Sequence, residues 1–244
     1  MTMTLSFRHR SVSILLIGAL GCASGELLLP EPPDGGENVQ LSKLGGNGGD
    51  GQEGVVGEKL PQPVAVQVLT PRELPAVGRK VAFVITSATG EVTPDTAITR
   101  SDGTATALWV LGTVPGPYTI EARLVGGDSL SQRLDFTAQA KPGAPDTLSP
   151  ITPLTQPGRR GQNALTAPVV RVVDKFGNVV PDVMVAWQVT AGAGTTGEPI
   201  TRTGPDGTTT VDWRLGERIG VHKLTAIIER ASGSPVTFTA TVLF

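Results

Sequence analysis

The sequence predicts an all-β protein built from two β-sandwiches in tandem, and three observations lead to this prediction. The chain of 244 residues contains 31 glycines and 20 prolines without a collagen period, as expected for many turns between short strands. A long segment recurs after 104 residues. Within both copies apolar and polar residues alternate, which is typical of strands that have one face on a core.

Composition excludes several classes of protein. The 20 Lys and Arg residues against 22 Asp and Glu residues leave no basic surplus for binding nucleic acid. The single cysteine excludes a disulfide scaffold, and the 39% hydrophobic content excludes a disordered acidic chain.

The N-terminus has the features of an export signal, predicted over residues 1–21. Arg8 and Arg10 precede an apolar run at 14–20, which is much shorter than the roughly 20 residues that cross a bilayer. The run ends in Ala-Leu-Gly-Cys at 19–22, which resembles the lipobox of bacterial lipoproteins. The resemblance implies cleavage before Cys22 and acylation of that residue. An ordinary exported protein with an incidental cysteine remains the alternative.

Acylation implies that a membrane is one partner of this protein, because several acyl chains hold a protein stably. Removing residues 1–21 leaves 18 basic and 22 acidic residues, so the mature chain has no evident affinity for nucleic acid. Ala23 follows the cysteine where an inner-membrane retention signal would place Asp; in a Gram-negative source this implies sorting to the outer membrane or cell surface. Residues 22–36, rich in Pro and Gly, are predicted to be the lipidated cysteine and a flexible tether.

The internal repeat defines two units. Of the 21 positions from Asp102 to Ala122, nine are identical 104 residues later. Counting back one period from the last residue places the units at 37–140 and 141–244.

Each unit is predicted to hold roughly seven strands in about 100 residues, as in an immunoglobulin-like sandwich. Ala105, Ala107, Trp109 and Leu111 alternate with Thr104, Thr106, Leu108 and Val110, and the second copy alternates more regularly between apolar and polar residues. The Asp-Gly pairs lie between such runs and predict two-residue type I′ hairpins. The predicted core aromatics are Phe83, Trp109, Phe136, Trp187, Trp213 and Phe238, and the predicted turn pairs are Asp102-Gly103 and Asp206-Gly207.

Several motifs together carry a family resemblance. Gly-Gln at 51–52, the run at 170–180 with its Asp-x-x-Gly-Asn turn, Trp-Arg-Leu-Gly at 213–216 and Phe-Thr-Ala at 238–240 resemble the bacterial immunoglobulin-like domains of group 1. That family forms the extracellular rods of invasin and intimin and occurs in bacterial lipoproteins. The first unit departs from the pattern, since Thr70, Glu73 and Leu74 replace the turn motif and its glycine-rich stretch at 45–57 is longer.

Candidate chemical sites are few. After cleavage His222 is the only histidine, and it falls where the first unit has Tyr118, in phase with core-facing Leu224, so we expect a packed imidazole. No catalytic residue, metal site or cofactor is predicted, since one histidine and no free thiol form neither a nucleophilic triad nor a zinc site.

One carboxylate allows two interpretations. Asp174, Asn178 and Asp182 offer the oxygen ligands that calcium prefers. The alternative, which we favour, is that Asp174 caps a turn containing Gly177 and Asn178 through its own backbone.

These observations predict a non-enzymatic, membrane-anchored lipoprotein of the cell envelope. Its immunoglobulin-like units would serve as a stalk or as an adhesion module for an envelope or extracellular protein or glycan. The alternative is an envelope polysaccharide-binding or enzyme-accessory module, which would need exposed aromatic rings, and Tyr118 is the only tyrosine.

Overall fold

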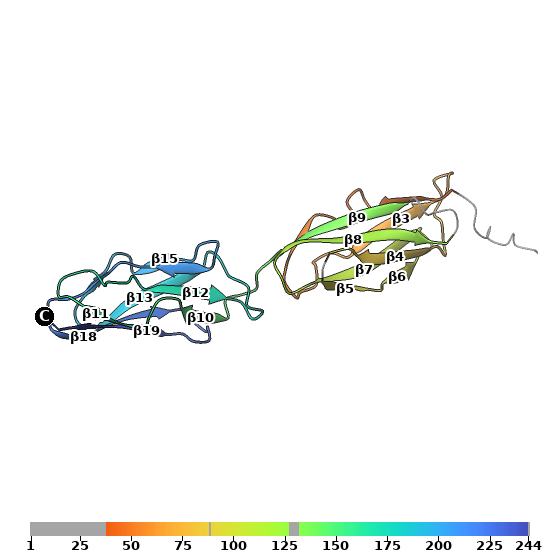
Figure 1. The fold of residues 1–244 in the computed structure, drawn as a ribbon. Coiled ribbons are helices and arrows are strands. Elements are labelled where there is room, and N and C mark those ends of the chain that lie inside the picture. Colours follow the sequence, from red (N-terminus) through yellow and green to blue (C-terminus); the bar gives the residue numbers. More distant parts are fainter. Residues whose placement is uncertain (1–37, 88, 127–131, 244) are drawn as a thin grey trace, which may run out of the picture. The chain divides into compact units, whose positions relative to one another are not determined.

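The computed structural model describes residues 38–87, 89–126 and 132–243 (Figure 1). The predicted signal at 1–21, Cys22 and the tether lie outside the described residues. The described ranges contain strands β1 to β19 and no helix, which confirms the all-β prediction. Accordingly, no helix within them has the length and hydropathy needed to span a membrane.

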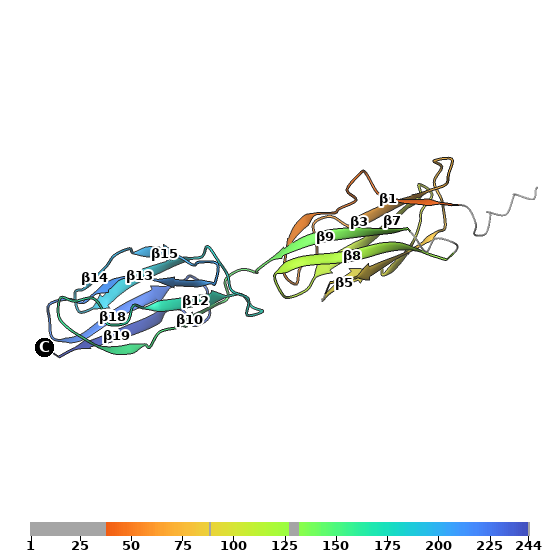
Figure 2. The ribbon, with the colours of Figure 1, turned by 45° about the horizontal axis from the view of Figure 1, so that its top comes forward.

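The first sandwich has two sheets, packed face to face (Figures 1 and 2). One sheet has the order β1-β3-β7-β5, with bounds Gln40–Lys43, Val64–Leu69, Thr104–Leu111 and Gly90–Thr93. The other has the order β2-β9-β8-β4-β6, with bounds Gln52–Val55, Arg133–Lys141, Gly116–Val125, Lys80–Ile85 and Thr96–Ile98.

The second sandwich repeats this arrangement. Its larger sheet has the order β11-β19-β18-β13-β15, with bounds Thr155–Gly158, Val236–Val242, Gly220–Ile227, Met184–Ala191 and Ile200–Arg202. Facing it are β10-β12-β16 (Thr147–Pro150, Val169–Val173, Thr208–Thr210) and the short pair β14-β17 (Thr195–Thr196, Trp213–Arg214). Strands β13, β15, β16 and β18 begin 104 residues after β4, β6, β7 and β8, so the sequence period is also the structural period.

Each sandwich encloses its own apolar core. Burial of large side chains, at about 1.5–3 kcal/mol for each, stabilises a fold that has no disulfide in the described residues. The six predicted core aromatics are at most 4% exposed: Phe83, Trp109, Phe136, Trp187, Trp213 and Phe238.

The buried indole N–H groups differ in whether they have a hydrogen-bond partner. Trp187 Nε1 donates a hydrogen bond of 2.8 Å to Thr201 Oγ1. Trp109 and Trp213, which are equivalent in the two units, have no partner for Nε1 among the described residues. Burial of each ring leaves one N–H without a hydrogen bond. This loss reduces the stabilisation gained from burying the ring but does not cancel it.

The first Asp-Gly hairpin is not of the predicted type I′. Gly103 has φ of 75°, but Asp102 is not among the described non-glycine residues with positive φ. Arg100 N donates to Thr104 O and Gly103 N donates to Arg100 O, each at 2.9 Å, so the loop has three residues. Only the last residue of such a loop must be left-handed, and glycine provides it. Asp102 acts through its carboxylate, which accepts a bond of 3.0 Å from Thr104 N.

The second hairpin needs the same correction. Gly207 has φ of 71°, while Asp206 is likewise not among the residues with positive φ in the described chain. Gly204 N donates to Thr208 O at 2.8 Å, and Asp206 Oδ1 accepts from Thr208 N at 3.0 Å. The type I′ prediction was wrong because it counted only the two residues of the motif as the loop.

The turn motif missing from the first unit does not remove the turn. In the second unit Asp174 N donates to Asn178 O at 2.8 Å, and Gly177 N donates to Asp174 O at 2.9 Å. In the first unit Thr70 N donates to Leu74 O at 2.8 Å and the N–H of Glu73 to Thr70 O at 2.9 Å.

The two versions of this turn differ in backbone strain. Gly177 has φ of 85° and Glu73 has φ of 59°. A residue with a Cβ in this region costs roughly 1–2 kcal/mol, whereas glycine adopts it freely. The first unit therefore keeps the turn in a strained form.

Replacing Glu73 by Gly should raise the free energy of unfolding of the first sandwich by about 0.5 kcal/mol, because relief of strain exceeds the added chain entropy. The matched change Gly177→Ala should destabilise the second sandwich by about 1 kcal/mol, since a Cβ there meets no atom within 4 Å and only the backbone is strained. Urea unfolding followed by hydrogen exchange in each sandwich measures both. A stabilising effect of Gly177→Ala would contradict this account.

Candidate functional site

The first strand of each sandwich is divided between the two sheets. β1 pairs with β3, and the chain then crosses to the other sheet, where β2 runs parallel to the last strand, β9. In the second sandwich β10 pairs with β12, and β11 runs parallel to the last strand, β19. All other paired strands in both sandwiches are antiparallel. We call the parallel pairs β2–β9 and β11–β19 the terminal-strand clamps.

Glycines make the crossing in the first sandwich possible. Gly48 and Gly49 are buried and have φ of 56° and 83°. A Cβ at either position would collide with a backbone carbonyl oxygen, that of Ala65 or of Pro63. The glycine-rich stretch is thus required for a tight crossing between sheets.

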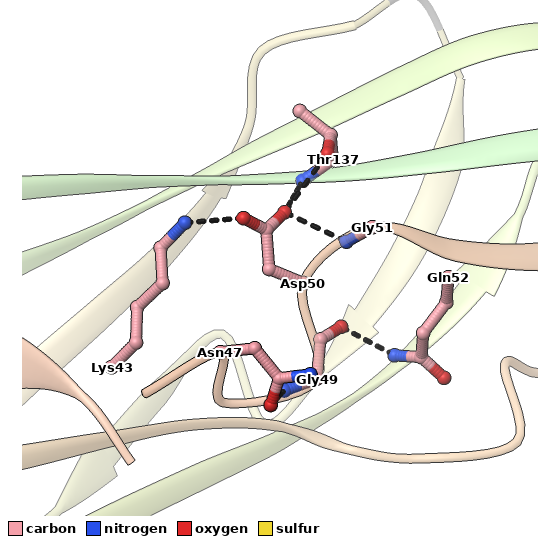
Figure 3. A network of polar contacts seen from close by, with 7 residues as sticks. All are labelled: Lys43, Asn47, Gly49, Asp50, Gly51, Gln52 and Thr137. Carbon is pink, nitrogen blue, oxygen red and sulfur yellow. Dashed lines mark hydrogen bonds and ion pairs between the residues drawn. The ribbon is translucent and has the colours of Figure 1, made fainter. Parts of the chain in front are cut away.

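Asp50 joins the end of this crossing to β9 (Figure 3). Its Oδ1 accepts hydrogen bonds from Thr137 N at 2.6 Å, from Thr137 Oγ1 at 2.8 Å and from Gly51 N at 2.8 Å. Its Oδ2 pairs with the ammonium group of Lys43 in β1, which also lies 4.9 Å from the centroid of the Phe136 ring. One carboxylate therefore connects the two halves of the first strand to the last strand.

These contacts shift the titration of Asp50. Burial by itself would raise the pKa of the carboxyl group. The hydrogen bonds from Lys43 and Thr137, together with the charge of Lys43, outweigh it and lower the pKa from 3.8 to about 2. Asp50 is consequently ionised throughout the range in which the protein would function, and its bonds are charge-assisted.

In the second sandwich a backbone group replaces the carboxylate. Thr239, the counterpart of Thr137, donates its N–H to the carbonyl oxygen of Leu154 at 2.7 Å. Leu154 lies 104 residues after Asp50. The longer glycine-rich crossing of the first unit thus uses a side chain for a bond that the shorter one makes with its main chain.

A glutamine in β2 and its counterpart in β11 each bond to the backbone of a residue ten positions later. Gln52 Oε1 accepts from Gln62 N at 2.8 Å, and its Nε2 donates to Gln62 O at 3.0 Å. Gln156 makes the same two bonds with Thr166, both at 2.8 Å. Gln52 entered the family resemblance only as part of a Gly-Gln motif, and the identity of the two glutamines at a spacing of 104 residues was the signal that could have predicted their structural role.

Asp174 is fully used within its turn. Its Oδ1 accepts from Phe176 N and Asn178 N, and its Oδ2 from Gly143 N and Asn178 Nδ2, all at 2.9 Å. Burial by itself would raise the pKa of Asp174. The four hydrogen bonds outweigh this effect and lower the pKa. No lone pair remains directed at a cation, so the carboxylate caps the turn.

Asn178 donates to Asp174 through its side-chain amide nitrogen, and Asp182, the second carboxylate of the calcium hypothesis, pairs with another residue. Asp182 forms an ion pair of 2.9 Å with Arg202. Within the described ranges no group of three or more His, Cys, Asp or Glu side chains could hold a metal ion. The arrangement offers backbone capping rather than metal ligation.

His222 and Tyr118 occupy equivalent places and make equivalent bonds. Tyr118 OH donates to Val114 O, four residues upstream, at 2.7 Å. His222 Nε2 lies 2.9 Å from Arg218 O, also four residues upstream, and its Nδ1 accepts from Gly216 N at 3.3 Å. Both ring nitrogens of His222 are engaged and its side chain is 1% exposed, so it has the geometry of a corner residue, not of an accessible base.

Asp50, Gln52, Gln156, Asp174 and His222 thus all bond to backbone groups, and the distinctive construction is the pair of terminal-strand clamps. It holds the two ends of each sandwich together.

A scan against protein-family models finds no match, and neither does a search of curated proteins. Among solved structures, the chain is similar to FdeC, an Escherichia coli adhesin, with 19% identity and a TM-score of 0.53, over 84% of this chain and 62% of that one. Other matches are the D0-D1 domain of intimin (18%, TM-score 0.33, 82% and 94%) and invasin, a bacterial integrin-binding protein (21%, TM-score 0.36, 84% and 39%). The chain thus spans less than two thirds of the FdeC and invasin structures. The likeness to FdeC shows a shared fold, in agreement with the predicted immunoglobulin-like β-sandwich.

Replacing Asp50 by Asn should destabilise the first sandwich by on the order of 2 kcal/mol at pH 7. The folded pKa lies below the unfolded value, so the stabilisation is present above about pH 4 and is lost as the pH falls toward 2. Hydrogen exchange of peptides covering β9, measured at pH 7 and in acid, checks both statements. Asp182→Asn, which removes only an exposed ion pair, serves as the control. A deficit in Asp50→Asn that is independent of pH would show that its charge is not the cause.

Proposed function

We propose that the chain is a surface stalk that carries tension between an N-terminal membrane anchor and a partner bound further along the chain. The observation that carries this proposal is the parallel pairing of the first and last strands in both sandwiches. Force applied to the two ends of a sandwich acts directly on these two strands.

The direction of the applied force, relative to the strands, decides how strongly such a pair resists unfolding. Two parallel strands pulled from opposite ends must slide past one another, so their hydrogen bonds share the load. An antiparallel hairpin pulled at its open end would lose its bonds one at a time. In β2–β9 the pairing runs from Gln52↔Ala138 to Val55↔Lys141, and Asp50 adds its bonds to Thr137 just before it. Forced unfolding is governed by the rate of crossing this barrier rather than by equilibrium stability.

The anchor belongs to the same proposal. The lipobox-like segment ending at Cys22 supports export, acylation and retention in a membrane, at the outer membrane or cell surface of a Gram-negative cell. Residues 23–36 would separate the lipid from the first sandwich by roughly 20 Å, from a flexible-chain estimate. On this account residues 37–140 and 141–244 act as two domains in series.

The partner that the stalk would present to, or bind, is proposed to be an extracellular or envelope protein. The similarity in fold to an E. coli adhesin supports this choice. The polysaccharide alternative loses its main requirement, because Tyr118 is 5% exposed and all three tryptophans are at most 4% exposed. Phe176, at 39%, is the most exposed aromatic side chain in the described ranges.

Single-molecule force spectroscopy on residues 37–244, held by the two ends, tests the mechanical role. We expect two unfolding events, and Asp50→Ala should lower the force of one of them because it removes the bonds next to β2. Arg202→Ala, which breaks an ion pair between β15 and the turn before β13, should leave both forces unchanged. Equal forces in the parent and Asp50→Ala proteins would sink the idea of a clamp in the first sandwich.

Metabolic labelling with palmitate tests the anchor. The parent protein should incorporate label and fractionate with membranes, whereas Cys22→Ser should do neither because the acylated thiol is gone. Inhibition of the lipoprotein signal peptidase by globomycin should cause the precursor to accumulate. Membrane fractionation of an unlabelled Cys22→Ser protein would show that another feature provides the anchor.

A further inference from the structure

A groove of about 550 Å³ lies at the side of the first sandwich, between edge strand β6 and the first half of β7. Its lining is mostly apolar, with Ile98 of β6 and Leu108 of β7 among the exposed contributors, at 60% and 43%. Residues of β7 that point to the core and residues that point outward both contribute. The groove thus follows the edge of the strand, not one face of the sheet.

The backbone of β7 is open toward this groove. Thr106 is paired directly with Ala65 of β3, and both backbone groups of Ala65 bond to the crossing segment on its other side, at Leu44 N and Gly48 O. Opposed residues in an antiparallel pair either bond to each other or both point away. The N–H and C=O of Thr106 therefore point away from β3, and neither has a partner among the described residues.

The opening exists because strand β5 ends early. β5 pairs with Leu108 to Leu111 and stops at Thr93. Asp95, the next residue that could face Thr106, instead accepts a hydrogen bond of 2.7 Å from Phe83 N in the other sheet. The chain continues there as β6, so the first half of β7 keeps a free edge.

The second sandwich has different side chains at the equivalent place. Thr201 and Thr209 are joined by a hydrogen bond of 2.7 Å between their hydroxyl groups. At the positions 104 residues earlier the first sandwich has Ala97 and Ala105, which both line the groove and cannot make this bond.

The exposed residues at the rim of the groove also differ between the two sandwiches. Ile98 and Leu108 correspond to Arg202 and Asp212 in the second sandwich. Charged residues at a sheet edge discourage the addition of another strand, and Arg202 is held there by its ion pair with Asp182. The first sandwich has exposed aliphatic side chains at this edge instead, which would favour an added strand.

We propose that the first sandwich binds an extended peptide segment of a partner protein by strand addition along the free edge of β7. This rests on the proposed function as an interaction stalk and names the class of its partner. The unpaired N–H and C=O of Thr106 would supply main-chain hydrogen bonds, and the aliphatic lining would take alternate side chains of the peptide. Thr104 adds no further free group, because its O accepts from Arg100 N and its N–H donates to Asp102.

One charge specifies the peptide further. Arg100 lines the end of the groove, is exposed and forms no salt bridge within the described ranges. An acidic residue beside the apolar segment of the peptide would complement it. The partner segment is therefore extended, aliphatic at alternate positions and acidic at one end.

Selection of phage-displayed random dodecapeptides on immobilised full-length protein in detergent tests the proposal. Enriched peptides, synthesised with a fluorescent label, should have this pattern and should protect the amide of Thr106 from hydrogen exchange. Leu108→Asp, which installs the residue of the second sandwich at an exposed position, should weaken binding by about tenfold or more. Methylation of alternate backbone nitrogens of the peptide should also abolish binding, because it blocks strand pairing but leaves the side chains unchanged.

Val221→Asp, at a position of the second sandwich that is 51% exposed, is the matched control and should bind like the parent. The proposal is overturned if no peptide is enriched, if Leu108→Asp binds as well as Val221→Asp, or if methylated peptides still bind. It is equally overturned if sedimentation shows that the parent chain associates with itself and Leu108→Asp does not, since the edge would then serve a second copy. Unchanged unfolding forces in Leu108→Asp would show that the stalk function stands independently of this result.

Discussion

The first strand of each sandwich is divided between two sheets, and much of the structure depends on how the chain crosses from one sheet to the other. The chain begins along one sheet, crosses the end of the core and then pairs with the last strand of the other sheet. Without the crossing, β9 would expose an unpaired edge and the first and last strands would not touch. The crossing brings a row of backbone groups into register over four residue pairs in each sandwich. It also explains why glycine, Asp50 and Gln52 lie so close together in the sequence.

The two copies show that one geometry can be reached with different chemistry. A charged carboxylate bonds to Thr137 in one unit, and a main-chain carbonyl bonds to Thr239 in the other. A tyrosine hydroxyl and an imidazole make the same bond four residues back along the chain. Some core positions keep the same residue, such as Trp109 and Trp213, whereas the buried Phe83 corresponds to Trp187. The copies therefore differ within their cores as well as at their edges and crossings.

Most of the aspartates that the sequence analysis singled out accept hydrogen bonds from backbone N–H groups. Asp102, Asp174 and Asp206 each accept from N–H groups of the following residues, and hydrogen bonding to the ionised form lowers the pKa of each. Groups held in this way stay charged and orient loops. They are poorly suited to proton transfer, which needs a pKa near the working pH. These three aspartates therefore act on the geometry of their own loops.

The sequence by itself determined the strand pattern, the tandem repeat, the immunoglobulin-like class and the burial of the aromatic side chains. These features follow from local alternation and from a period of 104 residues, both of which are readable along the chain. Only the tertiary structure decided that the Asp-Gly loops have three residues, that Glu73 takes the place of a glycine, and that Asp50 reaches a strand 87 residues away. It alone also revealed the free edge of β7. Such features depend on which segments meet in space, and the spacing of residues along a chain does not specify where a neighbouring strand stops.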